Sequence, residues 1–162
     1  MNAMQLTKYR FNRKEGKVYL EKGNVLIDSG NSIKAIILWA SAPIYGKPFL
    51  YLPAQDWVQL TFFDKHGNWC HAVLNNGTTN ALSSWLAYRK EIEVVQGLEL
   101  CSVITTIGFE EIDCNHQCFD YSFSGIPGKE GLGDRMRLLI QQSKYPLIES
   151  LGLVGKCFAF GQ

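Results

Sequence analysis

The side chains best suited to chemistry lie on two alternating runs, WVQLTFF and WCHAVL, which the turn DKHGN separates. Asp64 and Gly67 in that turn predict a hairpin in which Phe63 pairs with Trp69. Strand alternation then gives one wholly apolar face that must belong to the core: Val58, Leu60, Phe62, Cys70, Ala72 and Leu74. The opposite face, here called the aromatic hairpin face, holds Trp57, Gln59, Thr61, Phe63, Trp69 and His71.

The aromatic hairpin face is typical of a platform for nucleic-acid bases, because each base stacked on an aromatic ring contributes about 1–3 kcal/mol with little sequence preference. Lys65 at the hairpin tip and the nearby Lys34 and Lys47 would contact phosphates. The basic N-terminus adds Lys8, Arg10, Arg13 and Lys14. Two other interpretations stay open: the face lies under the C-terminal helix, or it forms the core of a protein interface.

Charge is unevenly distributed, although the whole chain has a formal charge of only +1. Residues 1–22 hold six basic and two acidic side chains, a formal charge of +4, whereas residues 91–120 hold seven acidic and no basic side chains. A histone-like binder is therefore excluded, and any nucleic-acid surface must be a local patch. The alternative is that both stretches are solvated faces of the fold.

The segment SGIPGKEGLGDR is a second candidate site, because it links a predicted strand to a predicted helix. Lys129 and Arg135 would add positive charge to an anion site at the N-terminus of that helix. Glu130 follows Gly128 and Lys129 at the position where a Walker phosphate-binding loop needs Ser or Thr, so an NTPase is excluded. A plain loop is the alternative interpretation.

Metal and nucleophilic chemistry have weaker support. Cys114, His116 and Cys118 alternate, but residues two apart on a strand lie about 6.6 Å apart, which does not suit ligands of one Zn²⁺. Cys70 and His71 are neighbours on a strand and point to opposite faces, so they cannot form a thiolate–imidazole pair. We therefore expect no enzyme activity, no cofactor and no metal.

Most of the elements expected to carry these side chains are strands. Strands are expected at residues 17–20, 25–27, 33–40, 57–63, 69–74, 98–112 and 119–124, with an edge or loop at 45–52 and a bulge or bend at Gly108. A helix capped by Thr78, Thr79 or Asn80 carries Leu82, Trp85 and Leu86 at helical spacing. A second helix is expected at 134–143, followed by a short helix at 147–151 and a strand at 157–160.

This order of elements resembles a five-stranded OB-type barrel, in which a helix lies between the third and fourth strands. The resemblance rests on element order over residues 18–125, and it implies that strands 2 and 3 bind single strands. We predict one α+β, mostly β domain over residues 1–162. The OB-like five-stranded barrel occupies about 18–125, and a helical extension occupies 126–162.

Five cysteines, an odd number in a chain long enough to fold without disulfides, indicate free thiols in a reducing compartment. No signal-peptide pattern is visible, and no apolar run approaches the roughly 20 residues of a spanning helix. We expect a soluble cytoplasmic protein with no membrane association. Its expected function is non-enzymatic binding of single-stranded DNA or RNA. The alternative is an interaction or assembly module that uses the same aromatic face with a protein partner or as a homodimer.

Overall fold

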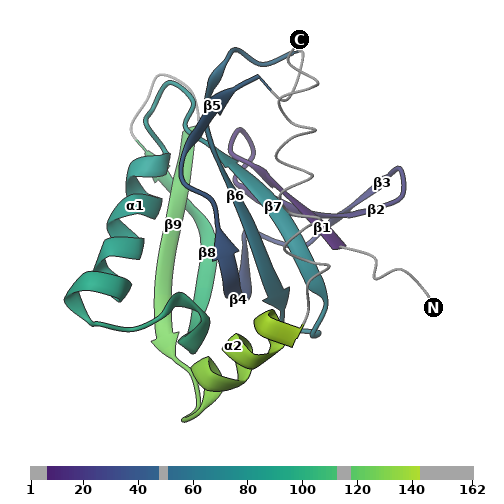
Figure 1. The fold of residues 1–162 in the computed structure, drawn as a ribbon. Coiled ribbons are helices and arrows are strands. Elements are labelled where there is room, and N and C mark those ends of the chain that lie inside the picture. The colour runs from purple at the N-terminus through teal and green to yellow at the C-terminus, as the bar shows by residue number, and fades with distance from the viewer. Residues whose placement is uncertain (1–6, 48–50, 113–117, 143–162) are drawn as a thin grey trace.

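The computed structural model describes residues 7–47, 51–112 and 118–142, and most of these residues lie in β-strands (Figure 1). Nine strands form one sheet in the order β3-β2-β1-β7-β6-β4-β8-β9, with β5 paired beside β6. The strand bounds are β1 Thr7–Asn12, β2 Lys17–Lys22, β3 Val25–Asp28, β4 Ser32–Ala40, β5 Ile44–Gly46, β6 Gln55–Asp64, β7 Trp69–Asn75, β8 Val103–Ile112 and β9 Cys118–Pro127. The pair of β1 and β7 is parallel, and the other strand pairs are antiparallel.

The sheet curls into an open half-barrel (Figure 1). The expected mostly β fold is confirmed, but the closed five-stranded barrel is wrong. Strands β1 to β3 extend the sheet beyond β7, and β8 and β9 extend it beyond β4, so the ends of the sheet are β3 and β9. Two α-helices lie among the described residues: α1 (Leu82–Lys90) after β7 and α2 (Leu132–Gln142) after β9. The helices expected after the hairpin and at 134–143 are therefore confirmed.

The predicted hairpin of β6 and β7 is confirmed in its register. Phe63 lies opposite Trp69, and Thr61 lies opposite His71. The turn forms because an Asp64 carboxylate oxygen accepts hydrogen bonds from the backbone N–H groups of His66 and Asn68, each at 2.9 Å, while Gly67 supplies a φ of +77°. The predicted apolar face is also confirmed, since its members are between 0% and 2% exposed: Val58, Leu60, Phe62, Cys70, Ala72 and Leu74.

Helix α1 packs against the apolar face of β8 and β9 (Figure 1). Its Trp85 is fully buried, with its ring centroid 5.3 Å from that of Phe123. The Tyr88 hydroxyl lies 2.7 Å from the Thr105 hydroxyl on β8. Gly125 permits this close approach, because a Cβ atom at that position would lie 2.5 Å from the Tyr88 hydroxyl oxygen.

The start of α1 differs from the expected cap. Ala81 precedes the helix without a side-chain cap, and the Leu82 N–H instead donates to the Asn76 side-chain oxygen at 3.1 Å. Asn80 adopts a left-handed backbone conformation with a φ of +58°. The Thr79 hydroxyl donates to Asp120 on β9 at 2.6 Å. A tertiary contact therefore takes the hydroxyl that the local pattern would have assigned to the cap.

The strand expected at 98–112 begins later, at Val103, after a short 3₁₀ turn over Leu100–Ser102. Gly108 pairs with Ser122 and with Ser32 in continuous registers, so the bulge expected there is absent from β8. A Cβ atom on Gly108 would lie 2.9 Å from the Ser32 Cβ, which explains the glycine by close strand approach. The irregularity lies in β4 instead, between Ile37 and Trp39.

The edge expected near residue 45 is confirmed as β5, which pairs with the start of β6. The elements predicted at 147–151 and 157–160 lie outside the described residues, as do Cys114 and His116. None of the described helices is long and apolar enough to cross a membrane.

Candidate nucleic-acid interface

The aromatic hairpin face is mostly buried. Gln59 and Thr61 are 2% and 0% exposed, and Trp57 and His71 are each 8% exposed. The expectation of an uncovered face is therefore wrong for these four side chains. Phe63 and Trp69 are half-buried, and their ring centroids lie 4.5 Å apart. This pair is the part of the face that retains aromatic surface in contact with solvent.

His71 lies in an environment that disfavours its charged form. Burial lowers its pKa to about 4, and the charge of Lys8 acts in the same direction. Lys8 is exposed and lies opposite His71 in the short parallel ladder of β1 and β7. Neither His71 Nδ1 nor the Gln59 side-chain amide has a hydrogen-bond partner among the described residues. The neutral imidazole is therefore unsuited to phosphate contact near pH 7.

A cleft opens where β1 separates from β7. The two strands pair only at Thr7 with Cys70 and at Lys8 with His71, after which β1 continues along β2 alone. The space between them has a volume of about 440 Å³ and is here called the β1–β7 cleft. Aromatic and basic side chains share its walls: Phe11, Tyr19, Tyr51, Trp57 and Tyr121 with Arg10, Arg13 and Lys14.

The β1–β7 cleft brings together four of the residues predicted from the sequence as nucleic-acid contacts: Arg10, Arg13, Lys14 and Trp57. Two of them, Trp57 and Arg13, instead have structural roles. The Trp57 indole donates to the Gly46 carbonyl oxygen at 3.1 Å, which fixes its ring. Arg13 lies in a dense network: it donates to Thr79, to Asn75, to the Phe119 carbonyl oxygen at 3.2 Å and to Asp120 at 3.0 Å. Its side chain is only 14% exposed, so it belongs to the framework of the fold.

The cations accessible at the cleft are Arg10 and Lys14. Half of the Arg10 side chain is exposed, and its guanidinium lies 3.6 Å from Glu21 in a loose surface ion pair. Lys14 is exposed and forms no ion pair with a described residue. Burial raises the pKa of Tyr121 at the inner wall to about 12, so its hydroxyl stays neutral.

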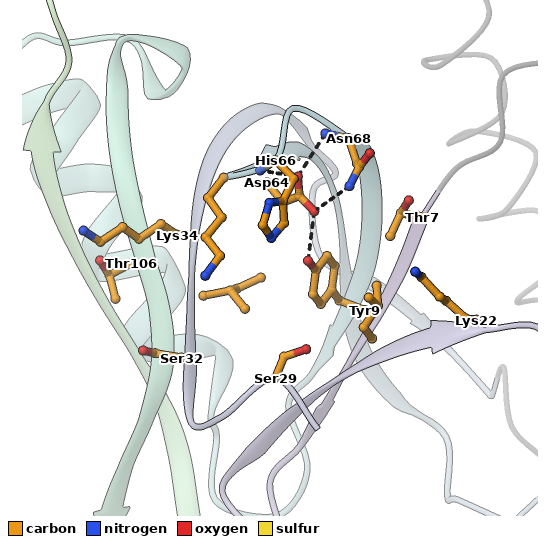
Figure 2. A pocket seen from close by; sticks show the side chains of 13 residues that line it. Thr7, Tyr9, Lys22, Ser29, Ser32, Lys34, Asp64, His66, Asn68 and Thr106 are labelled. Carbon is orange, nitrogen blue, oxygen red and sulfur yellow. Dashed lines mark hydrogen bonds between the residues drawn. The ribbon is translucent and has the colours of Figure 1, made fainter. Parts of the chain in front are cut away.

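A second hollow, here called the mouth groove, has a volume of about 800 Å³ (Figure 2). It lies beside the hairpin tip, where residues of β1, β2, β4 and β8 approach the 64–68 turn. Lys65, predicted from the sequence as a phosphate contact, lines it together with Lys22 and Lys34. Tyr9 lines both hollows.

Lys129 and Arg135 lie in and after the turn that starts α2. The Lys129 carbonyl oxygen accepts from the Leu132 N–H at 3.0 Å, and the Arg135 N–H donates to the Gly131 carbonyl oxygen at 3.1 Å. Both side chains are exposed and line neither the β1–β7 cleft nor the mouth groove. The anion site at this loop stays a prediction, separate from the other predicted residues.

The described thiols are unsuited to nucleophilic chemistry. Burial raises the pKa of Cys70, and its Sγ donates to the Asn68 carbonyl oxygen at 3.2 Å. Burial also raises the pKa of Cys101, to about 11. Within residues 7–47, 51–112 and 118–142, no group of three or more His, Cys, Asp or Glu side chains is placed to hold a metal ion.

Tyr19, Tyr51 and Lys22 were missed as candidate site residues by sequence reasoning. Tyr19 and Lys22 lie on one strand, in a segment where only the summed charge was informative. Tyr51 follows a segment interrupted by Gly46 and Pro48, which indicated only a loop or an edge. No local pattern in the sequence connects them to Trp57 or Lys65.

Comparison of the chain with protein-family models, with curated proteins and with solved structures gives no match.

Proposed function

We propose that the protein binds single-stranded nucleic acid without catalysis, with a base in the β1–β7 cleft and the phosphate backbone on Arg10 and Lys14. The observation that carries the proposal is the shared lining of that cleft: the exposed ring of Tyr51 and the half-buried rings of Phe11 and Tyr19 lie beside the accessible cations of the first hairpin. Stacking is sequence-tolerant because every base has a π-face, and Lys and Arg neutralise phosphates.

The modest number of free cations sets the expected strength of binding. For single strands, each neutralised phosphate contributes a slope of about −0.7 to the dependence of log affinity on log salt concentration. Two contacts, from Arg10 and Lys14, therefore predict a slope of about −1.4. A near-neutral chain with a local basic patch fits this shallow dependence.

Fluorescence anisotropy of labelled oligo-dT over a salt series tests the proposal. Arg10→Gln with Lys14→Gln should bring the salt slope close to zero and weaken binding about tenfold at low salt. Tyr51→Ala should also weaken binding, because this ring is 74% exposed and its loss barely affects the core. The matched control is Lys90→Gln, an exposed cation of α1 that lines neither hollow. An unbound wild type at low salt, or an unchanged double variant, contradicts the proposal.

Trp57 needs a conservative change in this test. An alanine at a side chain only 8% exposed would cost about 3–5 kcal/mol of stability, and loss of binding would then report unfolding. Trp57→Phe keeps a ring against the cleft and removes the indole donor to Gly46. Thermal unfolding of each variant separates loss of binding from loss of fold.

A second candidate function is self-assembly, and strand β3 is the observation that favours it. Its three apolar residues, Val25, Leu26 and Ile27, are 62%, 45% and 42% exposed. β3 ends the sheet and pairs with β2 along one side. An exposed apolar edge strand is a template for pairing with another chain. Assembly would then use this edge rather than the mostly buried aromatic hairpin face.

A further inference from the structure

We propose that the mouth groove is a binding site for a nucleotide-sized ligand that carries two or more phosphate groups. This site is separate from the β1–β7 cleft and does not depend on the nucleic-acid proposal. Three lysines that form no ion pair with a described residue, a carboxylate already occupied by hydrogen bonds and a set of hydroxyl groups lie around one hollow of about 800 Å³.

The positive charge of the groove comes from Lys22 on β2, Lys34 on β4 and Lys65 at the hairpin tip. All three are exposed, and none forms an ion pair with a described residue. The ladder of β4 with β6 ends at Ala35 opposite Asp64, and Lys34 and Lys65 are the next residue of each segment beyond that pair. An anion bound in the groove would offset part of this local excess of positive charge.

Asp64 is the acidic side chain among the described residues that line the groove, and its oxygens are already occupied. They accept hydrogen bonds from the Tyr9 hydroxyl at 2.9 Å, from the backbone N–H groups of His66 and Asn68 at 2.9 Å, and from the Asn68 amide at 3.2 Å (Figure 2). Burial by itself would raise the pKa of Asp64, but these hydrogen bonds outweigh burial and lower it. The carboxylate is ionised and 7% exposed, so it faces the turn rather than a ligand.

The lining therefore has an excess of positive charge, with three lysines against one occupied carboxylate. In Figure 2, Lys22 and Lys34 lie on opposite sides of Tyr9 and Asp64, and the Lys34 ammonium points away from both, so these two lysines belong to different walls of the groove. Positive charge on separate walls suits a ligand whose own negative charge is divided between two or more phosphate groups.

The neutral part of the lining suits the remainder of such a ligand. Ser29, Ser32 and Thr106 offer hydroxyl groups, and Leu20 and Ile33 offer apolar surface. The volume falls within the roughly 300–1,000 Å³ usual for small-molecule sites. These features fit a nucleoside polyphosphate better than a simple inorganic anion.

Isothermal titration calorimetry with inorganic triphosphate and with adenosine triphosphate, at about 50 mM salt, tests the site. The wild type should bind both probes saturably, and the adenosine compound more tightly. Lys34→Gln with Lys65→Gln should weaken both at least tenfold. Both lysines are exposed, so the double variant should keep its fold, as thermal unfolding would verify. The matched control is again Lys90→Gln, which should bind like the wild type. No saturable binding by the wild type, or equal binding by the double variant, overturns the proposal.

Oligo-dT distinguishes the two sources of phosphate. If the double variant loses triphosphate but binds oligo-dT normally, the groove takes a free phosphorylated ligand. If triphosphate competes with oligo-dT and the double variant loses both, the groove holds the nucleic-acid backbone. If triphosphate binds and oligo-dT does not, the mouth groove stands while the nucleic-acid proposal fails. Loss of oligo-dT binding in Arg10→Gln with Lys14→Gln, with triphosphate binding intact, supports both sites.

Discussion

His71 shows how burial decides the state of a single side chain. From the sequence, it is a polar residue on an aromatic strand face and a predicted contact for nucleic acid. In the structure it is 8% exposed, and burial together with nearby Lys8 lowers its pKa to about 4. In the folded protein His71 is therefore a neutral interior side chain. Its lowered pKa makes the stability of the protein depend on pH.

The protein should lose stability as the pH falls from about 6.5 toward 4, because His71 takes up a proton in the unfolded chain before it does so in the folded one. The resulting loss in the free energy of unfolding reaches about 3 kcal/mol once His71 is protonated in both the folded and the unfolded state. Above about pH 6.5 His71 is neutral in both states, and no loss occurs. Urea unfolding between pH 4.5 and 8 measures it. His71→Gln should flatten the curve in that window, with Lys90→Gln as the control. A curve of the same slope in both variants would contradict the assignment to His71.

At the level of elements, β3 differs from the other strands because all four of its residues are exposed. Among the described strands it pairs with β2 alone, and it carries three apolar side chains at the end of the sheet. Two copies of an antiparallel edge can pair symmetrically about a two-fold axis, since each supplies the same free backbone groups. Assembly through β3 would thus form a closed dimer rather than an open chain.

Size-exclusion chromatography with light scattering, from about 10 to 200 µM protein, tests assembly through β3. The wild type should dimerise with rising concentration, and Val25→Lys with Ile27→Lys should stay monomeric, because charged edges repel each other. Val94→Lys is the matched control, since Val94 is 70% exposed and follows α1. A wild type that is monomeric throughout the range, or a lysine variant that still associates, would leave β3 without this role.

On the scale of the whole molecule, Arg13 holds together parts of the curled sheet that are far apart in the chain. It follows β1, yet it contacts Asp120 and the Phe119 carbonyl on β9, and Thr79 before α1. Its guanidinium also lies 5.5 Å from the centroid of the Tyr121 ring. The sheet is therefore drawn together at this point by side chains, without a ladder between β1 and β9.

Arg13→Met should lower the free energy of unfolding by about 3 kcal/mol, because it leaves the partly buried Asp120 carboxylate without its charged partner. Arg10→Met, at a half-exposed and loosely paired arginine of the same hairpin, should cost at most about 1 kcal/mol. Urea denaturation followed by tryptophan fluorescence compares the two variants. Equal effects would show that the network around Arg13 does not hold the sheet together.

The hairpin of β6 and β7 and the division of its two faces follow from the amino-acid sequence alone. The pairing of Phe63 with Trp69 follows from a short turn containing Asp64 and Gly67, and side-chain alternation then allots every residue to a face. The helix after this hairpin and the mostly β class were likewise predicted from the sequence. Each of these depends on residues near one another in the chain, where periodicity and turn chemistry act directly.

What covers each face of the hairpin, and which residues meet at the two hollows, depends on contacts between distant parts of the chain. Trp57 looks exposed by alternation but is buried, while Arg13 looks like a free cation but is bound to Asp120, 107 positions away. Strands β1 and β7 pair over two residues only, and the β1–β7 cleft lies where they separate. The curl of the sheet brings Lys22 to the same groove as Lys65. The physical reason is that closing a longer loop costs little extra entropy, so the choice among distant partners falls to packing and hydrogen bonding across the whole chain, which no local pattern records.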